Sequence, residues 1–240
     1  MGQRLADKKV LIVGASSGMG EATARYFAAA GAQVAVAARS VDKLEKLAGE
    51  LGGGAVACGG DVEDAASVEV MVEQAVAVLG RIDIVVYATG TNIPERSLEV
   101  LSAETWDMMM RTNLSGAFHC TKAVLPIMRG QGVGLIIYVS SAAVQVADTS
   151  GVAYQATKHG MVGLAGGTFK EERDNGIRTS VIFPGLTDTP LVFKRPVPTP
   201  PEVMVHALAP NDVADACLFV AGLPPRCYVP ELVLMPAGLA

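Results

Sequence analysis

Residues 10–20 read VLIVGASSGMG, in which four branched apolar residues pass directly into glycines with the spacing G-x-x-x-G-x-G. A short apolar run of this kind is typical of a buried strand in a parallel sheet. Apolar residues then recur at helical intervals as far as Gly31, so the glycines lie between a strand and an amphipathic helix. Backbone at such a turn approaches a phosphate closely, and a tight turn without a ligand is the alternative.

The same alternation of strand and helix continues along the chain. Helical spacing returns over residues 68–79, and further apolar runs follow at Val34–Val36, Ile82–Tyr87, Leu135–Val139 and Thr179–Phe183. Right-handed crossovers between parallel strands then predict an α/β fold, a single doubly wound (Rossmann-type) parallel sheet with helices on both faces. The ligand crevice of such a sheet lies at the carboxyl ends of its strands.

Composition excludes several classes of protein. Half of the 240 residues are apolar and no linker interrupts them, so we expect one domain over residues 1–240. The net charge of −5, without a basic run, gives nucleic acid or an anionic membrane no electrostatic footprint. No targeting or membrane segment is evident, so we expect a cytoplasmic protein. Neither a metal site nor a disulfide is expected from Cys58, Cys120, Cys217 and Cys227, which lack paired spacing.

The end of the second strand indicates which dinucleotide the crevice holds. It reads Ala37-Ala38-Arg39-Ser40, without the carboxylate that binds a ribose 2′-hydroxyl in folds that prefer NAD. The Arg39 guanidinium suits a 2′-phosphate, so NADP(H) is favoured over NAD(H), unless Arg39 is simply an exposed arginine. Asp61, after the third strand, either accepts from the adenine amino group or caps the helix that follows.

Tyr154 and Lys158 are four residues apart, which places them on one face of a helix. A free tyrosine ionises near pH ~10, and a nearby ammonium together with an oxidised nicotinamide would lower the pKa of the phenol. The pair therefore predicts a general base, although most pairs with this spacing are neighbours on a helix surface.

Two further polar residues fit the same chemistry. Ser141 follows the strand Leu135–Val139 and can donate to a substrate carbonyl oxygen, with Ser140 as its rival. Asn113 interrupts a helical segment that its amide disfavours. A kinked helix, with a bound water linked to Lys158, would use Asn113, and a solvent-facing side chain is the alternative.

These motifs occur together in one order: Gly14-x-x-x-Gly18-x-Gly20, Asp61, Gly90, Asn113, Ser141, Tyr154-x-x-x-Lys158 and Pro184-Gly185. In this respect the chain resembles the short-chain dehydrogenase/reductase family over nearly its whole length. The resemblance implies that Tyr154 is the general acid/base, Ser141 the donor to the substrate oxygen, Lys158 the ribose anchor that tunes the tyrosine, and Asn113 the holder of a proton-relay water.

The resemblance also assigns the cofactor contacts. The glycine turn would pass the pyrophosphate, and Thr187 or Thr189 would hold the nicotinamide carboxamide. The predicted cofactor-binding residues are Gly14, Ser16, Ser17, Gly18, Met19, Gly20, Arg39, Asp61, Val62, Gly90, Tyr154, Lys158, Pro184, Gly185, Thr187 and Thr189.

The chain departs from the family pattern at three places. Val13 replaces a threonine, and the glycine turn lacks a basic residue, so the cofactor preference depends mainly on Arg39. Tyr87-Ala-Thr-Gly90 stands where the family commonly has Asn-Asn-Ala-Gly, and we expect a bond that braces the central strands to be missing.

The expected function is an NADP(H)-dependent oxidoreductase that interconverts a small carbonyl compound and its alcohol. Its substrate would contact Ser141, Gln145, Tyr154 and Phe193, beneath a flexible flap over about residues 186–208, where prolines discourage a continuous helix. A substrate carboxylate held by Arg195 or Lys194 is a second possibility. A homotetramer or homodimer is expected from the family, and a non-catalytic dinucleotide sensor or scaffold is the alternative function.

Overall fold

The computed structural model describes residues 4–239 and contains one sheet of seven parallel strands. The strand order is β3-β2-β1-β4-β5-β6-β7. The strands are β1 (Lys9–Val13), β2 (Gln33–Ala38), β3 (Val56–Gly59), β4 (Ile84–Tyr87), β5 (Gly134–Val139), β6 (Ile177–Pro184) and β7 (Glu231–Leu234). The predicted doubly wound parallel sheet is therefore confirmed.

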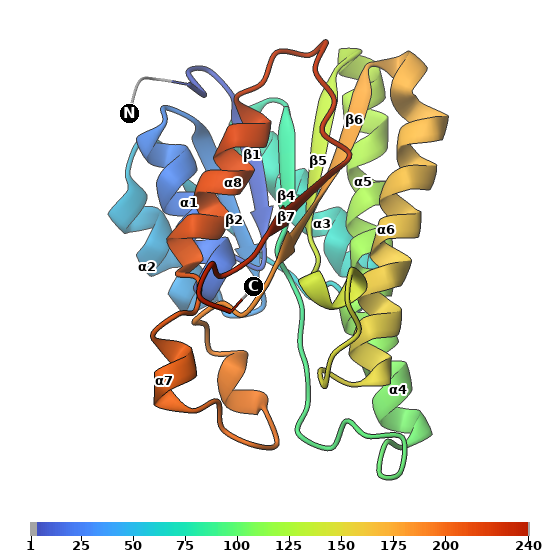
Figure 1. The fold of residues 1–240 in the computed structure, drawn as a ribbon. Helices are drawn as coiled ribbons and strands as arrows, with labels where there is room; N and C mark the ends of the chain where they lie inside the picture. Colours follow the sequence, from blue (N-terminus) through green and yellow to red (C-terminus); the bar gives the residue numbers. More distant parts are fainter. Residues whose placement is uncertain (1–3, 240) are drawn as a thin grey trace.

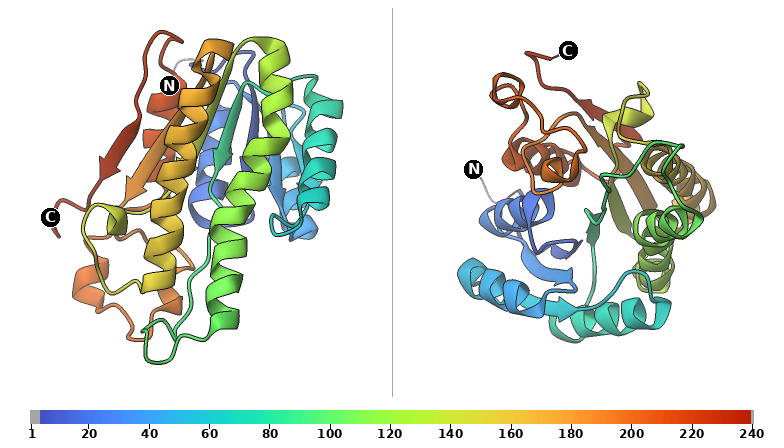
Figure 2. Two further views of the ribbon diagram at one scale, coloured as in Figure 1. Left: turned by 90° about the vertical axis from the view of Figure 1, so that its right-hand side faces the viewer. Right: turned by 90° about the horizontal axis from the view of Figure 1, so that it is seen from below.

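Helices cover both faces of the sheet (Figure 2). One face carries α1 (Gly18–Ala29), α2 (Val41–Leu51) and α8 (Pro210–Ala221), and the other carries α3 (Ala65–Leu79), α5 (Gly116–Gln131) and α6 (Val152–Glu172). The short α4 (Ala103–Met109) precedes α5, and α7 (Pro201–Met204) lies in the proline-rich segment. Among residues 4–239, no helix is both long and apolar enough to cross a membrane.

Strand alternation divides the core into two layers. Leu11 and Val13 of β1 pack on the side of α3, α5 and α6, whereas Val10 and Ile12 pack on the side of α1, α2 and α8. All four side chains are fully buried. Burial of a side chain of this size contributes about 1.5–3 kcal/mol, which explains why a short run such as residues 10–13 determines a strand.

The order of the strands reverses between β1 and β4, and this switch point places the crevice. The glycine turn follows β1, Gly90 follows β4, and Ser141 follows β5, so all three lie at one edge of the sheet. In Figure 1, the loop after β4 and the segment that contains α7 both extend beyond this edge.

One strand was not anticipated. β7 has only four residues, between Pro230 and Pro236, and its side chains alternate between exposed and half-buried positions. An edge strand this short carries a weak apolar signal because only one of its neighbours is a strand.

The predicted flap contains two short helical turns, η4 (Val192–Lys194) and α7, in agreement with its many prolines. Its two ends are bonded to each other: Leu208 N donates to Leu186 O, and Asp188 N donates to Leu208 O. The segment is thus a closed loop with a narrow base.

Candidate active site

The glycine turn has a backbone that other residues would not adopt. Gly14 has a φ of +92°, and a Cβ there would lie 2.7 Å from Thr89 N. A Cβ on Gly20 would overlap the Gly14 carbonyl oxygen. Ser17, the N-cap of α1, makes no side-chain capping bond, so amides of the first turn are left for another partner. This arrangement fits a phosphate group at the helix N-terminus.

A cavity of about 340 Å³ lies beside this turn. Its lining includes most of the predicted cofactor residues: Gly14, Ser16, Ser17, Gly18, Met19, Arg39, Asp61, Val62, Gly90 and Thr189. Tyr154, Pro184, Gly185 and Thr187 instead line a second cavity of about 450 Å³, and Met19, Thr189 and Leu191 line both. The two cavities therefore adjoin. Gly20 and Lys158 line neither cavity.

Arg39 lies at the rim of the first cavity with a side chain that is 69% exposed. Its Nη1 is 4.0 Å from Asp61 Oδ2, and an exposed pair of this kind contributes only about 0–1 kcal/mol. The capping role considered for Asp61 is wrong: the N-cap of α3 is Asp64, which accepts from Ala66 N. Asp61 is displaced from this role because its Oδ1 accepts from Glu63 N within the preceding turn.

Tyr154 and Lys158 lie on α6 and are only 9% and 3% exposed, which excludes the helix-surface alternative. Lys158 Nζ lies 5.7 Å from the centroid of the Tyr154 ring and donates to Val139 O at 3.0 Å. The ammonium is thus fixed against the end of β5, beside the phenol.

Burial determines how these two groups ionise. It raises the pKa of Tyr154, against the opposite effects of the Ser141 hydroxyl and of the Arg96 and Arg195 charges. It also lowers the pKa of Lys158 to about 8. In the protein without a dinucleotide, desolvation of the phenolate dominates the pKa of Tyr154, and the ammonium of Lys158 is bonded to Val139 O. The lowering expected from the ammonium together with an oxidised nicotinamide stays a prediction.

The two adjacent serines have different partners. Ser140 is buried, and its hydroxyl donates to Lys158 O, which joins the end of β5 to α6. Ser141 Oγ accepts from Ala143 N at 3.2 Å, so its own proton stays available to an oxygen in the second cavity. The geometry favours Ser141 as the donor.

Asn113 is fully buried within a π-helical turn over Met110–Ser115, so the solvent-facing alternative is wrong. This turn interrupts the α-helical geometry between α4 and α5, at the position where an interruption was expected. Its Oδ1 accepts from Thr91 N, and its Nδ2 donates to Thr91 O and Thr157 Oγ1. A Cβ on Gly90 would lie 3.2 Å from Lys158 Nζ and 3.7 Å from Asn113 Oδ1. Glycine at position 90 therefore lets the loop pass close to both groups.

Tyr87 stands in the segment where a bond bracing the central strands was expected to be missing, and it forms a different hydrogen bond. Tyr87 is fully buried at the end of β4, and its hydroxyl donates to Thr112 O at 3.1 Å. Thr112 belongs to the π-helical turn, so Tyr87 joins the central sheet to the turn that carries Asn113.

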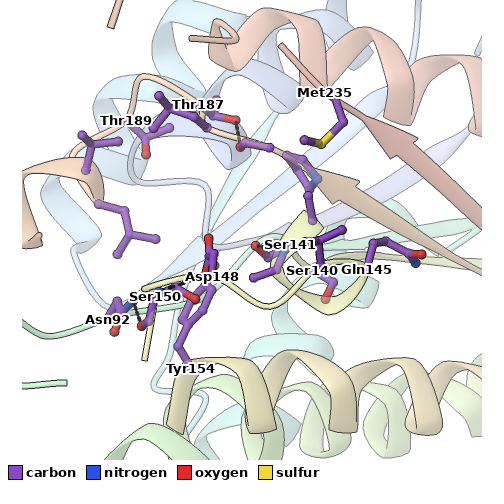
Figure 3. A pocket seen from close by; sticks show the side chains of 18 of the residues that line it. Asn92, Ser140, Ser141, Gln145, Asp148, Ser150, Tyr154, Thr187, Thr189 and Met235 are labelled. Atoms are coloured by element: carbon purple, nitrogen blue, oxygen red, sulfur yellow. Dashed lines mark hydrogen bonds between the residues drawn. The ribbon is translucent and has the colours of Figure 1, made fainter. Parts of the chain in front are cut away.

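Figure 3 shows Tyr154 rising from α6 into the second cavity, with Thr187 and Thr189 across from it.

Gln145 lines this cavity as predicted, but Phe193 does not: its side chain is 83% exposed. The prediction for Phe193 was wrong because the turn η4 directs its neighbour Val192 inward. Lys194 lines the first cavity and donates to Thr91 Oγ1, so it is not a candidate for binding substrate in the second.

Sequence reasoning missed several residues of the second cavity: Arg96, Asp148, Ser150 and Met235. They come from irregular loops or from the end of β7, where no periodicity indicates a direction. For Arg96, the one available signal is an arginine shortly after a strand end at the predicted crevice.

A family model described as short chain dehydrogenase matches residues 8–196. A cis-4-hydroxycyclohexanecarboxylate dehydrogenase of Sinomonas cyclohexanicum is 32% identical over 92% of this chain and 92% of its own length. A D-threitol dehydrogenase of Mycolicibacterium smegmatis is 35% identical over 91% of this chain and 87% of its own length.

Solved structures agree with this match. An alcohol dehydrogenase from Thermococcus sibiricus, complexed with 5-hydroxy-NADP, superposes with a TM-score of 0.86 at 34% identity, over 96% of this chain and 97% of that one. A 3-ketoacyl-(acyl-carrier-protein) reductase from Brucella melitensis, complexed with NADH, has a TM-score of 0.88 at 27% identity, over 97% and 98% of the two chains. The chain thus belongs to the short-chain dehydrogenase/reductase family of oxidoreductases.

Proposed function

We propose that the protein is an NADP(H)-dependent oxidoreductase that interconverts a small carbonyl compound and its primary or secondary alcohol. The observation that carries the proposal is the buried Tyr154, with the Lys158 ammonium beside it and the Ser141 hydroxyl in the same second cavity. The first cavity, built around the glycine turn, adjoins it. A sensor or scaffold would have no use for a buried phenol of this kind.

The first cavity fits a dinucleotide. The α1 amides and the glycine turn would hold the pyrophosphate, and the exposed Arg39 would pair with a 2′-phosphate. Asp61 and Val62 would contact the adenine, and Thr187 or Thr189 the carboxamide. Of the two solved relatives, one carries an NADP derivative and the other NADH, so the preference for NADP(H) depends on Arg39.

The bound nicotinamide would exchange a hydride with the substrate carbon. The chain's own residues would handle the oxygen and its proton. Ser141 would donate to the substrate oxygen, and Tyr154 would give a proton to that oxygen in reduction or remove it in oxidation. Lys158 would hold the ribose and stabilise the phenolate, and Asn113 would hold the water that relays the proton to solvent.

The test is a spectrophotometric screen at the nicotinamide band, with NADPH and NADH against aldehydes, ketones, oxo acids and secondary alcohols. The names of the relatives include a hydroxycyclohexanecarboxylate and a polyol, so both classes belong in the panel. We expect turnover of at least one class, faster with NADPH. Dinucleotide binding without any turnover would favour the sensor instead.

Assembly as a homotetramer or homodimer through α5 and α6 is part of the proposal. A Cβ on Gly163 or Gly166 would meet no described atom within 4 Å, so both positions permit close packing of a second copy. Gly160 serves a different purpose, since a Cβ there would lie 2.6 Å from Leu114 in the same chain. Light scattering would measure the number of chains in the assembly.

The cytoplasmic location stays a prediction.

A further inference from the structure

The lining of the second cavity carries more positive than negative charge. Its lining is mostly small or apolar, and its charged members among residues 4–239 are two arginines, Arg96 and Arg195, and one carboxylate, Asp148. An excess of positive charge beside a reacting phenol indicates which substrates the cavity attracts.

Arg96 is the unusual member because it is only 8% exposed. Its Nε donates to Ile93 O at 2.9 Å and its Nη2 donates to Lys194 O at 2.6 Å. Both partners are neutral carbonyls, and no carboxylate in the described part of the chain forms an ion pair with Arg96. A buried charge without a counter-ion costs free energy, so this guanidinium is held in position without being neutralised.

Neither of the other charged groups neutralises it. Arg195 carries the same charge, and burial first, then repulsion by Arg195, lower the pKa of Arg96. The Asp148 charge raises the pKa of Arg96 in part, but Asp148 is exposed and forms no ion pair with Arg96. Its Oδ1 instead accepts from Ser150 N at 2.8 Å in the turn before α6. An anion from outside the chain would supply the missing charge.

Arg96 also packs directly against the element that carries the phenol. Gly151 immediately precedes α6 and has a φ of +94°, and a Cβ there would lie 2.7 Å from Arg96 Cβ. Asn92 Nδ2 donates to Ser150 O and fixes the same two loops to each other. Packing therefore fixes the position of Arg96 relative to Tyr154. A site in which these two residues bind opposite ends of one substrate needs such a fixed separation.

We propose that the substrate is a hydroxy acid or oxo acid whose carboxylate pairs with Arg96, with Arg195 approaching from the flap, while its hydroxyl or carbonyl oxygen reaches Ser141 and Tyr154. The proposal rests on the oxidoreductase function above. The apolar walls, which include Leu186, Leu191 and Val192, suit an apolar carbon skeleton between the two polar ends. The planar fork of an arginine matches a carboxylate in two parallel hydrogen bonds.

The turnover test compares substrates that differ only in charge. 4-Oxopentanoate and 4-oxocyclohexanecarboxylate are each measured against their methyl esters with NADPH. We expect the wild-type kcat/KM to be at least about tenfold higher for the acids than for their esters. Arg96→Met should lower kcat/KM about 30-fold for the acids and less than about threefold for the esters. Arg195 is exposed, so Arg195→Gln cannot disturb the core. It should lower kcat/KM for the acids about fivefold. Arg226→Gln, at an exposed arginine outside the cavity, is the matched control.

A binding test separates this proposal from the proposed function. Calorimetry with dinucleotide present measures cyclohexanecarboxylate, its uncharged carboxamide and inorganic phosphate. We expect only the carboxylate to bind well, and less tightly in both cavity variants. Equal binding of acid and amide, unchanged binding in both variants, or tighter binding of phosphate would overturn the proposal. Absence of all turnover together with binding of the acid that depends on Arg96 would instead reject the oxidoreductase function while upholding the anion site.

Discussion

The two adjoining cavities are built in different ways. Backbone at the ends of β1 to β4 forms the first, where glycines such as Gly14 keep side chains away. Side chains form most of the second, chiefly from loops around residues 91–96, 141–150 and 184–195, together with Tyr154 of α6 and Met235 after β7. Strand ends are fixed by the sheet, whereas loop side chains are placed by contacts between distant segments. The first cavity therefore follows from the order of the strands, and the second depends on how the loops of this chain pack.

The largest expected effect is at Tyr154, in the second cavity. Tyr154→Phe removes the proton donor but keeps the ring, so kcat should fall about 10³-fold while NADPH binding is retained, in keeping with general acid/base catalysis. Stopped-flow turnover and fluorescence titration of NADPH measure the two quantities. Tyr228→Phe, at an exposed tyrosine stacked on Phe169, is the control. Retained turnover in Tyr154→Phe would remove the assigned role.

Gly20→Ala tests whether backbone alone builds the first cavity. The new Cβ would overlap the Gly14 carbonyl oxygen, so we expect a loss of about 2–4 kcal/mol in stability and of dinucleotide binding. Gly49→Ala is the matched control, because a Cβ there meets nothing within 4 Å in the interior of α2, and it should stabilise by about 0.5–1 kcal/mol. Urea unfolding measures both. Similar stabilities for the two variants would show that the turn tolerates side chains.

Arg39→Ala tests the one side chain on which the first cavity depends for selectivity. Loss of the guanidinium should lower the ratio of kcat/KM for NADPH over NADH about 10- to 100-fold, because a 2′-phosphate loses a charge-assisted partner. Initial rates with each dinucleotide give the ratio. An unchanged ratio would mean that Arg39 is an exposed arginine without a role in selection.

A smaller effect is expected on the stability of the folded protein, from the buried ammonium of Lys158. Its pKa is about 8 in the folded protein and 10.5 in the free side chain, so between these values the unfolded chain binds more protons. The lysine therefore makes the folded protein less stable below pH 8, and this cost is removed as the pH rises toward 10.5.

Urea unfolding at pH 8 and pH 10 without cofactor measures this cost. Relative to Lys158→Met, the wild type should gain about 2 kcal/mol over that interval. Other titrating groups are common to both proteins and cancel in the difference. A parallel pH dependence of the two proteins would contradict a desolvated ammonium at position 158.

The same contrast explains how far sequence reasoning reached. The sheet and the first cavity were predictable because Val10–Val13 and the glycines after it leave few alternatives for a buried chain. Tyr154 and Lys158 were predictable because a helix brings residues four apart together. Arg96 and Phe193 were not, since the direction of a loop side chain depends on partners such as Lys194 O, 98 residues away. β7 was not predicted either, because at the edge of the sheet its four side chains are exposed or half-buried, whereas those of the equally short β4 are all buried.

In the proposed mechanism, a buried phenol on α6 transfers the proton while a pyridine ring lies against it. A crystal structure of the complex with NADP⁺ would show whether the two groups meet. We expect the nicotinamide beside the Tyr154 hydroxyl and the 2′-phosphate at Arg39. A nicotinamide ring bound away from Tyr154, with the phenol facing only protein, would contradict it.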